Sequence, residues 1–409
     1  MPPDADDYRW LTSADGAEAL AQTAAQLKTT DVARVVVQLR QRFPAARCSL
    51  LVSQVELRRR ALAKFAAAER MFFADVALQQ ASGETVARHK ARRFPAAAPV
   101  LDLCCGIGGD ALALAERGPV TAIDRNESLT ILAQANLCTA GHVQYAVQCA
   151  DVTQAPPPAG ALVHIDPDRR PAQRRTTHVS LHEPSDAFLS RLIETVGGGA
   201  IKLAPGTAPP DAWRDRCHWE WISHDRECKQ LVAWFGSLAA APGATATRLI
   251  GADGQAASRR FDVSAIDLPP PLADRVGRFV YDADPALVAA RLHGAMALEC
   301  GLAATAPGAS YLTGDALVDD GLLAAFETLE VLPLDVKRLK AALRARRIGR
   351  LEIKKRGIDV SPEDLRKKLA LAGDEEAVVL ATLHGGKAVA ILARRVKTAG
   401  GGPRNLQLA

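Results

Sequence analysis

Carboxylates and glycines occur together in residues 100–110, whose sequence is VLDLCCGIGGD. The first four residues are mostly apolar, which is typical of a strand that is buried on both faces of a parallel sheet. The glycines that follow predict a sharp turn that a ligand can approach closely, because glycine has no Cβ. Asp102 stands just before this turn. A carboxylate there suits a ligand with an ammonium group or hydroxyls better than a ligand with phosphate.

Three more acids lie at or just past the ends of predicted strands: Asp124, Asp151 and Asp166. The carboxyl ends of parallel strands share one edge of an open α/β sheet, and ligands bind at that edge. We therefore expect the carboxylates of Asp102 and these three residues to converge on one crevice. An isolated Asp is more often a helix cap or a turn residue, but four at successive strand ends favour a binding site.

The glycine pattern also admits a dinucleotide site. Residues 106–111 satisfy the pattern G-x-G-x-x-A, and Asp124 follows Gly106 by 18 residues. This spacing is close to the roughly 20 residues expected before an acid that binds a ribose. Asp102 argues against a dinucleotide, because its carboxylate would face a pyrophosphate. A dinucleotide site would also leave the acids at positions 151 and 166 without a role.

Apolar runs alternate with helical patterns between residues 98 and 240. Five runs predict parallel strands: 100–103, 120–124, 143–147, 161–167 and 200–203. Residues 217–223 and 230–235 predict an antiparallel pair. Together these patterns predict an α/β fold, with a mostly parallel sheet that is covered by helices on both faces and has antiparallel strands at one edge.

The remaining segments differ in composition from this core. The predicted organisation is a helical domain at 1–97, the α/β domain at 98–240, a linker or insertion at 241–275, a small α+β domain at 276–397 and a disordered tail at 398–409. Basic residues in the helical domain, among them Arg58, Arg88 and Lys90, are interpreted as solvated helix faces. The alternative is that this domain touches nucleic acid or closes over the site.

Composition excludes several classes of protein. The chain has 409 residues, 48% of them hydrophobic, and a net charge of +5. Its eight cysteines include no C-x-x-C pair, which favours reduced thiols over a disulfide scaffold or a metal site. The first residues lack the features of a signal peptide, and no apolar run approaches the ~18 residues that a membrane helix needs. We expect a cytoplasmic protein with no membrane and no metal as partners.

The segment with these acids resembles a class I S-adenosylmethionine-dependent methyltransferase, whose Rossmann-like sheet has seven strands and an antiparallel last pair. The resemblance implies S-adenosyl-L-methionine as cofactor. Asp102, Gly106 and Gly108 would hold its amino acid part, Asp124 its ribose hydroxyls and Asp151 its adenine amino group. The implied cofactor-binding residues are Asp102, Cys104, Gly106, Gly108, Asp124, Arg125, Asp151 and Val152. The motif departs from the common form at Cys104, where glycine is usual.

The segment 165–170, IDPDRR, resembles the Asp-Pro-Pro-type loop of enzymes that methylate nitrogens of nucleobases. This resemblance implies catalytic roles for Asp166, Pro167 and Asp168, with the Asp and a loop carbonyl accepting hydrogen bonds from the acceptor amine. Arg169 replaces the usual aromatic residue, so Arg169 and Arg170 would contact RNA phosphate instead. Lys202, a charge in an apolar strand, is the fourth catalytic candidate. With Asp166 and Glu220 or Glu227, it leaves ribose 2′-O methylation open.

Positive charge is concentrated in residues 335–356, which hold ten Lys or Arg and two acids. The stripe from 337 to 356 has no aromatic residue, so it suits phosphate contacts better than base stacking. The last domain resembles a THUMP-like domain, which implies that it binds RNA, usually tRNA. The candidate RNA-binding residues here are Lys337, Arg338, Arg346, Arg347, Lys354 and Lys355.

We therefore expect an S-adenosylmethionine-dependent methyltransferase that acts on RNA, with tRNA as substrate and a base nitrogen as acceptor. Three alternatives stay open. The acceptor could be a protein or a small molecule, the glycine loop could serve an NAD-dependent oxidoreductase, or the chain could be an RNA-binding protein without catalysis.

Overall fold

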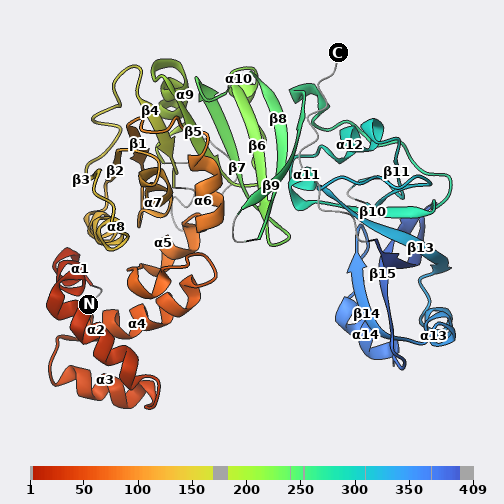
Figure 1. The fold of residues 1–409 in the computed structure, drawn as a ribbon, viewed down its shortest axis with the longest axis horizontal. Helices are drawn as coiled ribbons and strands as arrows, with labels where there is room; N and C mark the ends of the chain where they lie inside the picture. Colours follow the sequence, from red (N-terminus) through yellow and green to blue (C-terminus); the bar gives the residue numbers. More distant parts are fainter. Residues whose placement is uncertain are drawn as a thin grey trace. The chain divides into compact units, whose positions relative to one another are not determined.

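The fold is that of a computed structural model, which describes residues 3–168, 183–239, 241–251, 254–308, 310–369 and 371–396. Two compact units make up the chain. Residues 1–218, 232–241 and 251–254 form the first unit, and residues 219–231, 242–250 and 255–409 form the second. Figure 1 shows the order of their helices and strands.

Helices occupy the first part of the first unit, as the composition predicts (Figure 1). Their bounds are α1 Ala5–Thr12, α2 Ala14–Gln26, α3 Val32–Arg40, α4 Ala45–Ala61, the short 3-10 helix η1 Ala68–Arg70, α5 Asp75–Gln80 and α6 Glu84–Ala91. The side chains of Asp4, Ser13 and Asp31 accept backbone N–H groups and so cap the first three helices. Packing of the helices buries Leu11, Leu51 and other apolar side chains in one cluster.

The arginines at the end of α4 have partners close by. Arg59 pairs with Glu56 at 3.0 Å, and Arg60 pairs with Asp75 at 2.7 Å. Arg58 donates to a backbone carbonyl at 2.8 Å. Exposed ion pairs of this kind add little stability, but they occupy the cations. The end of α4 therefore presents these three guanidinium groups already engaged.

Nine strands form one sheet in the order β3-β2-β1-β4-β5-β7-β6-β8-β9. Their bounds are β1 Val100–Leu103, β2 Val120–Asp124, β3 Tyr145–Cys149, β4 Leu162–Ile165, β5 Gly198–Leu203, β6 Cys217–His224, β7 Glu227–Gly236, β8 Gly243–Ile250 and β9 Gln255–Phe261. The pairs β1–β2, β1–β4, β2–β3 and β4–β5 are parallel. Because the sheet order reverses between β1 and β4, the edge beside these two strands is the switch point at which such sheets bind ligands.

Helices alternate with the first strands, as predicted for an α/β fold (Figure 1). They are α7 Gly109–Ala115, α8 Glu127–Thr139, α9 Asp186–Thr195 and α10 Asp211–Arg214. Each buries apolar residues such as Leu114, Leu132 and Leu189. Covering helices explain why β1 and β5 are buried along nearly their whole length and why their sequences are apolar apart from Asp102 and Lys202.

The last strands of this sheet are joined by tight turns. Asp225 and Arg226 connect β6 to β7 with φ of 52° and 63°, the conformation of a two-residue hairpin turn. β8 and β9 pair antiparallel within the segment 241–275, which the sequence predicts to be a linker or insertion with a hairpin near residues 251–254. The hairpin lies where it is expected, and its strands extend the sheet beyond the seven that the pattern predicts.

The second unit contains a seven-stranded sheet in the order β11-β12-β10-β13-β16-β15-β14. Its elements are η4 Val263–Ala265, β10 Phe279–Ala283, α11 Pro285–Ala289, α12 His293–Glu299, β11 Ala303–Ala304, β12 Leu312–Gly314, β13 Leu323–Pro333, α13 Val336–Ala345, β14 Ile348–Lys355, α14 Pro362–Leu369, β15 Glu375–His384 and β16 Lys387–Arg395. α13 and α14 pack their apolar sides, including Leu339 and Leu365, on one face of β14, β15 and β16. The opposite faces of these helices are left to charged side chains. No helix in the described part of the chain has the length and hydropathy to cross a membrane.

Candidate active site

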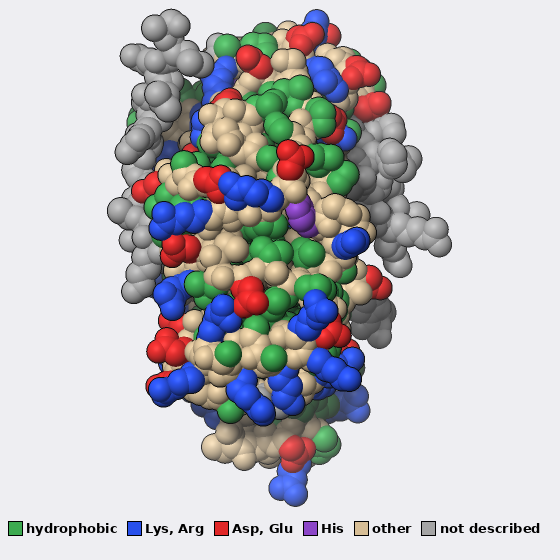
Figure 2. Space-filling model, turned by 90° about the vertical axis from the view of Figure 1, so that its right-hand side faces the viewer, with side chains coloured by type: hydrophobic (Ala, Val, Ile, Leu, Met, Phe, Trp, Pro, Cys, Tyr) green, Lys and Arg blue, Asp and Glu red, His purple; other side chains and the backbone are tan. Residues whose placement is uncertain are grey.

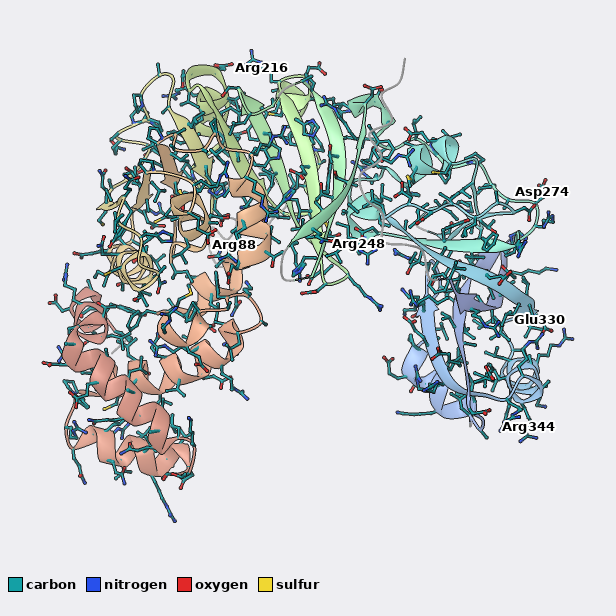
Figure 3. The ribbon with its side chains drawn as sticks, in the orientation of Figure 1. Arg88, Arg216, Arg248, Asp274, Glu330 and Arg344 are labelled. Atoms are coloured by element: carbon teal, nitrogen blue, oxygen red, sulfur yellow. The ribbon has the colours of Figure 1, made fainter. Side chains whose placement is uncertain are left out.

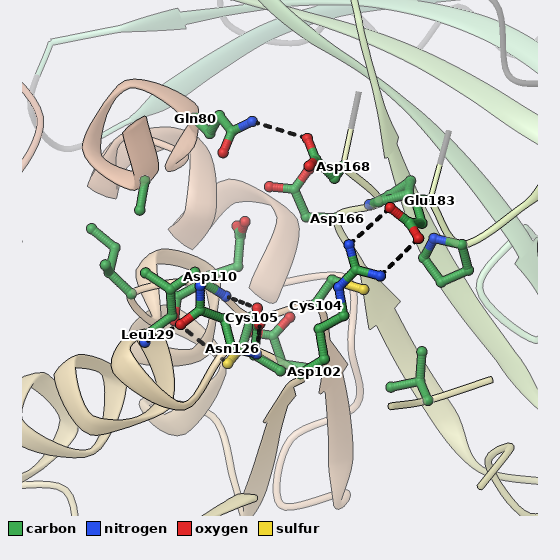
Figure 4. Close-up of a pocket in the computed structure, with 18 of the residues that line it drawn as sticks. Gln80, Asp102, Cys104, Cys105, Asp110, Asn126, Leu129, Asp166, Asp168 and Glu183 are labelled. Carbon is green, nitrogen blue, oxygen red and sulfur yellow. Dashed lines mark hydrogen bonds and ion pairs between the residues drawn. The ribbon is translucent and has the colours of Figure 1, made fainter. Parts of the chain in front are cut away.

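A cavity of about 260 Å³ opens at the carboxyl ends of β1, β2 and β4 (Figure 4). The four strand-end acids all line it: Asp102, Asp124, Asp151 and Asp166. The four acids that the sequence places at strand ends therefore do lie around one cavity, as predicted. The helical region contributes as well, because residues at the end of α5, including Gln80, form part of the wall.

The glycine turn approaches the cavity with its backbone. Gly106 has φ of +57°, and a Cβ added there would meet no atom within 4 Å, so it would point into open space. Cys104, where glycine is usual in the motif, has φ of +56°. The backbone thus keeps the left-handed conformation that glycine favours, and a cysteine occupies it. Burial, with the nearby carboxylates of Asp124 and Asp166, raises the pKa of the Cys104 thiol well above its ordinary value.

Asp124 fixes the turn from the end of β2. One carboxylate oxygen accepts the Gly106 N–H at 2.9 Å, and the other accepts the Asn126 N–H at 2.9 Å. Burial raises the pKa of Asp124, and these two bonds oppose that rise. Each oxygen keeps a lone pair for a further donor. A pair of adjacent ligand hydroxyls is a suitable donor set for this carboxylate.

Asp102 is fully buried, and its two oxygens differ. Oδ1 accepts a hydrogen bond from Nδ1 of His164, the third residue of β4, at 2.7 Å. Oδ2 has no hydrogen-bond partner among the described residues. An unpaired buried carboxylate oxygen is unfavourable, so the site requires a donor at this point. A ligand ammonium group supplies one.

Behind Asp102 lies a buried cation that the sequence interpretation places on a solvated face. Lys90 is only 1% exposed. Its Nζ lies 2.7 Å from Oδ1 of Asp110 and 3.1 Å from Nε2 of His164. Burial acts to raise the pKa of Asp110, but the positive charge of the adjacent Lys90 outweighs burial, and the pKa is lowered. The prediction of a solvated lysine is wrong, because α6 directs this side chain into the first unit and not to solvent.

Asp151 and Val152 lie at a more open part of the cavity. Asp151 is exposed and accepts the N–H and the hydroxyl of Thr153 at 2.9 and 2.7 Å, which lowers the pKa of its carboxyl. Val152 is buried and lines the wall. Arg125 also lines the cavity and forms a bidentate pair with Glu183 at 2.7 and 2.8 Å (Figure 4).

On the acceptor side, Lys202 and Asp166 form an ion pair. Nζ of Lys202 lies 2.5 Å from Oδ2 of Asp166 and donates to the backbone carbonyl of Gln80 at 2.8 Å. Oδ1 of Asp166 has no hydrogen-bond partner among the described residues. The carboxylate is therefore anchored through one oxygen, while the other stays available at the cavity.

Asp168 lies at the mouth of the cavity, beside Pro167. Its backbone exchanges hydrogen bonds with Glu183 at 2.7 and 3.0 Å, and its side chain accepts from the Gln80 amide at 3.3 Å. The candidate phosphate contacts Arg169 and Arg170 lie outside the described residues. Glu220 and Glu227, the acids considered for ribose methylation, are absent from the described lining, and they bond instead to Thr247 and Lys229.

The six candidate RNA-binding residues of the last domain fall into two groups. Lys337, Arg338 and Lys355 are exposed, and no ion pair joins them to another described residue. The other three have acidic partners: Arg346 pairs with Glu330, Arg347 with Asp374 and Lys354 with Asp282. Unpaired cations therefore concentrate on α13, where Arg344 is exposed as well (Figure 3).

The cavity fits a particular ligand. It offers an unpaired buried carboxylate oxygen on Asp102, a carboxylate with free lone pairs on Asp124, and a glycine turn without side chains. These features match an ammonium group and two hydroxyls. Among the described residues, no group of three His, Cys, Asp or Glu side chains could hold a metal ion.

Comparison with known proteins identifies the fold and the family. Family models match residues 100–165 as a methyltransferase domain, 323–395 as THUMP domain-like and 4–61 as a domain of unknown function. A presumed methyltransferase from Porphyromonas gingivalis, 20% identical, has the same fold, with a TM-score of 0.76 over 97% of this chain and 100% of that chain. The fold is thus that of a class I S-adenosylmethionine-dependent methyltransferase.

Uncharacterized S-adenosylmethionine-dependent methyltransferases from two strains of Mycobacterium tuberculosis are each 31% identical to this chain over 357 residues. The match covers 85% of this chain and 96% of each relative. The chain belongs to the family of these methyltransferases, and it carries a THUMP-like domain in its C-terminal part. It is an enzyme that uses S-adenosylmethionine, so the oxidoreductase and the non-catalytic alternatives are wrong.

Proposed function

We propose that this methyltransferase acts on RNA, with tRNA as the substrate, and that the methyl group goes to a base nitrogen. The geometry of Asp166 carries the proposal. Its carboxylate is anchored by Lys202 at 2.5 Å and keeps one oxygen available at the cavity. Pro167, the next residue, also lines the cavity, and its backbone carbonyl would be the second acceptor. Two acceptors side by side suit an amine that has N–H groups to donate.

In this proposal S-adenosylmethionine supplies a methyl group on a positively charged sulfur. Asp166 and the Pro167 carbonyl hold the N–H groups, so that the nitrogen lone pair points along the line of attack. The nitrogen would take up the methyl group that the sulfur gives up, and Asp166 would accept the proton that the nitrogen loses and pass it to solvent. Asp102 would hold the cofactor ammonium, and Asp124 would accept the ribose hydroxyls.

The RNA part of the proposal rests on α13. The helix carries Lys337, Arg338, Lys340 and Arg344 with no acid between residues 336 and 345. None of these four cations has an ion-pair partner among the described residues. In Figure 2, Lys and Arg side chains gather in the lower part of the face. A cationic helix without aromatic side chains suits the phosphate backbone of RNA.

Incubation with bulk RNA and cofactor labelled in its methyl group, followed by separation of the nucleosides, tests this function. We expect the label in a base of the tRNA fraction. Label in ribose would contradict the nitrogen acceptor, and label in protein or small molecules but not in RNA would contradict the substrate. One observation favours a protein or small molecule as the substrate: the described lining of the cavity contains no aromatic side chain on which a base could stack.

Neutralising α13 should weaken RNA binding. For the triple variant Lys337→Gln/Lys340→Gln/Arg344→Gln, we expect an affinity for tRNA at least about tenfold lower at 0.1 M salt, because phosphate contacts are lost. Each lost contact should also make the plot of log K against log salt less steep by about 0.7–0.9. Filter binding or fluorescence anisotropy at several salt concentrations measures both quantities.

The matched control is Arg275→Gln/Arg346→Gln/Arg347→Gln, which changes the net charge by the same amount in the same unit. Each of these arginines has an acidic partner, at 2.6, 2.8 and 2.9 Å. We expect a loss of affinity below about threefold for the control. Equal losses in both variants would show a response to net charge alone and would remove α13 as the contact surface.

A further inference from the structure

Lys90 has an unusually complete set of partners for a buried lysine. Its Nζ contacts Oδ1 of Asp110 at 2.7 Å, Nε2 of His164 at 3.1 Å and Oγ of Ser82 at 3.3 Å. An ammonium group has three N–H donors and no acceptor, so it donates to His164 and Ser82, and it pairs with the Asp110 carboxylate through charge. Ser82 in turn donates its hydroxyl to the second oxygen of Asp110 at 2.8 Å. The buried cation thus has a carboxylate counterion and two hydrogen-bond acceptors close to it.

This arrangement determines the tautomer of His164. Because Lys90 can only donate, Nε2 of His164 must accept and carries no proton. The proton of the neutral ring then lies on Nδ1, which donates to Oδ1 of Asp102 at 2.7 Å. The chain of contacts therefore runs in one direction, from Lys90 through His164 to Asp102, and it ends at the carboxylate that lines the cavity.

We infer that Lys90 and His164 are positioning residues for the cofactor: they orient the Asp102 carboxylate so that its free oxygen, Oδ2, receives the α-ammonium group of S-adenosylmethionine. This inference rests on the proposed role of Asp102. The relay holds Oδ1, and Oδ2 is left as a buried oxygen without a hydrogen-bond partner among the described residues. Neither Lys90 nor His164 lines the cavity in the described structure, so both act through Asp102.

Packing alone does not explain why Lys90 and His164, and not apolar residues, occupy these buried positions. A buried ion pair is generally no more stabilising than apolar side chains of similar volume, because both charges lose their hydration. His164 stands between Val163 and Ile165 on β4, where an apolar residue would fill the space as well. A polar relay that ends on an unpaired oxygen at a ligand cavity has a simpler explanation in ligand orientation.

Two ligands separate this role from general damage. S-adenosylhomocysteine carries the α-ammonium group, whereas 5′-methylthioadenosine has the same nucleoside and thioether but no amino acid part. We expect the wild-type protein to prefer S-adenosylhomocysteine. His164→Leu and Lys90→Met should each lower the affinity for it by about tenfold or more, while the affinity for 5′-methylthioadenosine changes by less than about twofold. Isothermal titration calorimetry measures both affinities.

His164→Asn is the rescuing variant, because its side-chain amide can donate to Asp102 in place of Nδ1. We expect it to restore the affinity for S-adenosylhomocysteine to within about threefold of wild type. Binding of 5′-methylthioadenosine also reports that the pocket is folded, and the two His164 variants keep the test decisive if Lys90→Met does not fold. An equal loss for both ligands, or no loss for either, would overturn the relay.

Asp102→Asn tests the assumption beneath the inference. It should remove the preference for S-adenosylhomocysteine and leave the binding of 5′-methylthioadenosine nearly unchanged. If the preference survives in Asp102→Asn, the role of Asp102 and the relay both fail. If the preference disappears there but persists in His164→Leu and Lys90→Met, the relay alone fails and the proposed cofactor site stands.

Discussion

Asp166→Ala is expected to reduce methyl transfer by at least about a hundredfold while the affinity for S-adenosylhomocysteine changes by less than about twofold. Positioned proton acceptors contribute roughly 10²–10⁴-fold to catalysis. In this protein the carboxylate is also one of the two groups proposed to orient the acceptor nitrogen. Single-turnover methyl transfer from labelled cofactor to RNA, with binding measured separately by calorimetry, gives the two numbers.

Asp211→Ala is the matched control, because it removes a carboxylate that is 98% exposed in its side chain and belongs to the same unit. We expect its activity to be that of the wild type. Asp166→Asn keeps the size of the side chain and its contact with Lys202 but loses the charge, so it should resemble the alanine variant. Near-normal turnover in both Asp166 variants would remove this residue from the mechanism.

Asp124→Ala should weaken binding of S-adenosylhomocysteine by more than tenfold, which is at least about 1.4 kcal/mol. The variant would lose the acceptor for the ribose hydroxyls. It would also lose the two bonds, each 2.9 Å, that hold the backbone of Gly106 and Asn126. Both losses should lower the affinity for the ligand. The effect should be large because hydrogen bonds to a charged carboxylate are stronger than neutral ones. Calorimetry with the purified variant measures the change.

Asp124→Asn keeps the size of the side chain and removes its charge. Its amide oxygen can still accept from Asn126, but its NH₂ group would face the N–H of Gly106. We therefore expect a loss close to that of the alanine variant. Unlike the variants at His164, both Asp124 variants should weaken the binding of 5′-methylthioadenosine as well, because that ligand has the same ribose. Unchanged affinity for either ligand would contradict the ribose contact.

The sequence predicts the sheet and its acids well, for a physical reason. Strands that are covered on both faces must be apolar, so a carboxylate at the end of such a strand stands out against its neighbours. Asp102, Asp124 and Asp166 are visible in this way, and the structure brings them to one cavity. The two-residue turn at Gly385 and Gly386 also has a local cause, because both residues have positive φ, a conformation that glycine adopts readily.

Contacts between distant parts of the chain are harder to infer. Lys90 has the sequence context of an exposed helix, and only the position of His164, 74 residues later in the chain, reveals its partner. A histidine inside an apolar strand is itself a signal, since a buried polar group needs a partner. The pairing of Arg347 with Asp374 depends in the same way on which strands become neighbours. The period of apolar residues predicts which face of a helix is buried, but it does not predict which residues pack against that face.

Three contacts between the segment before β1 and the site bear on how this enzyme could be dissected. Ser82 and Lys90 complete the charge balance of Asp110, and the Gln80 carbonyl receives the Lys202 ammonium. A catalytic fragment cut to begin at residue 98 would keep every motif residue of the sheet, yet it would leave the buried Asp110 without its counterion and the buried Lys202 without one of its two acceptors. A fragment that contains the methyltransferase sheet should therefore also include α5 and α6.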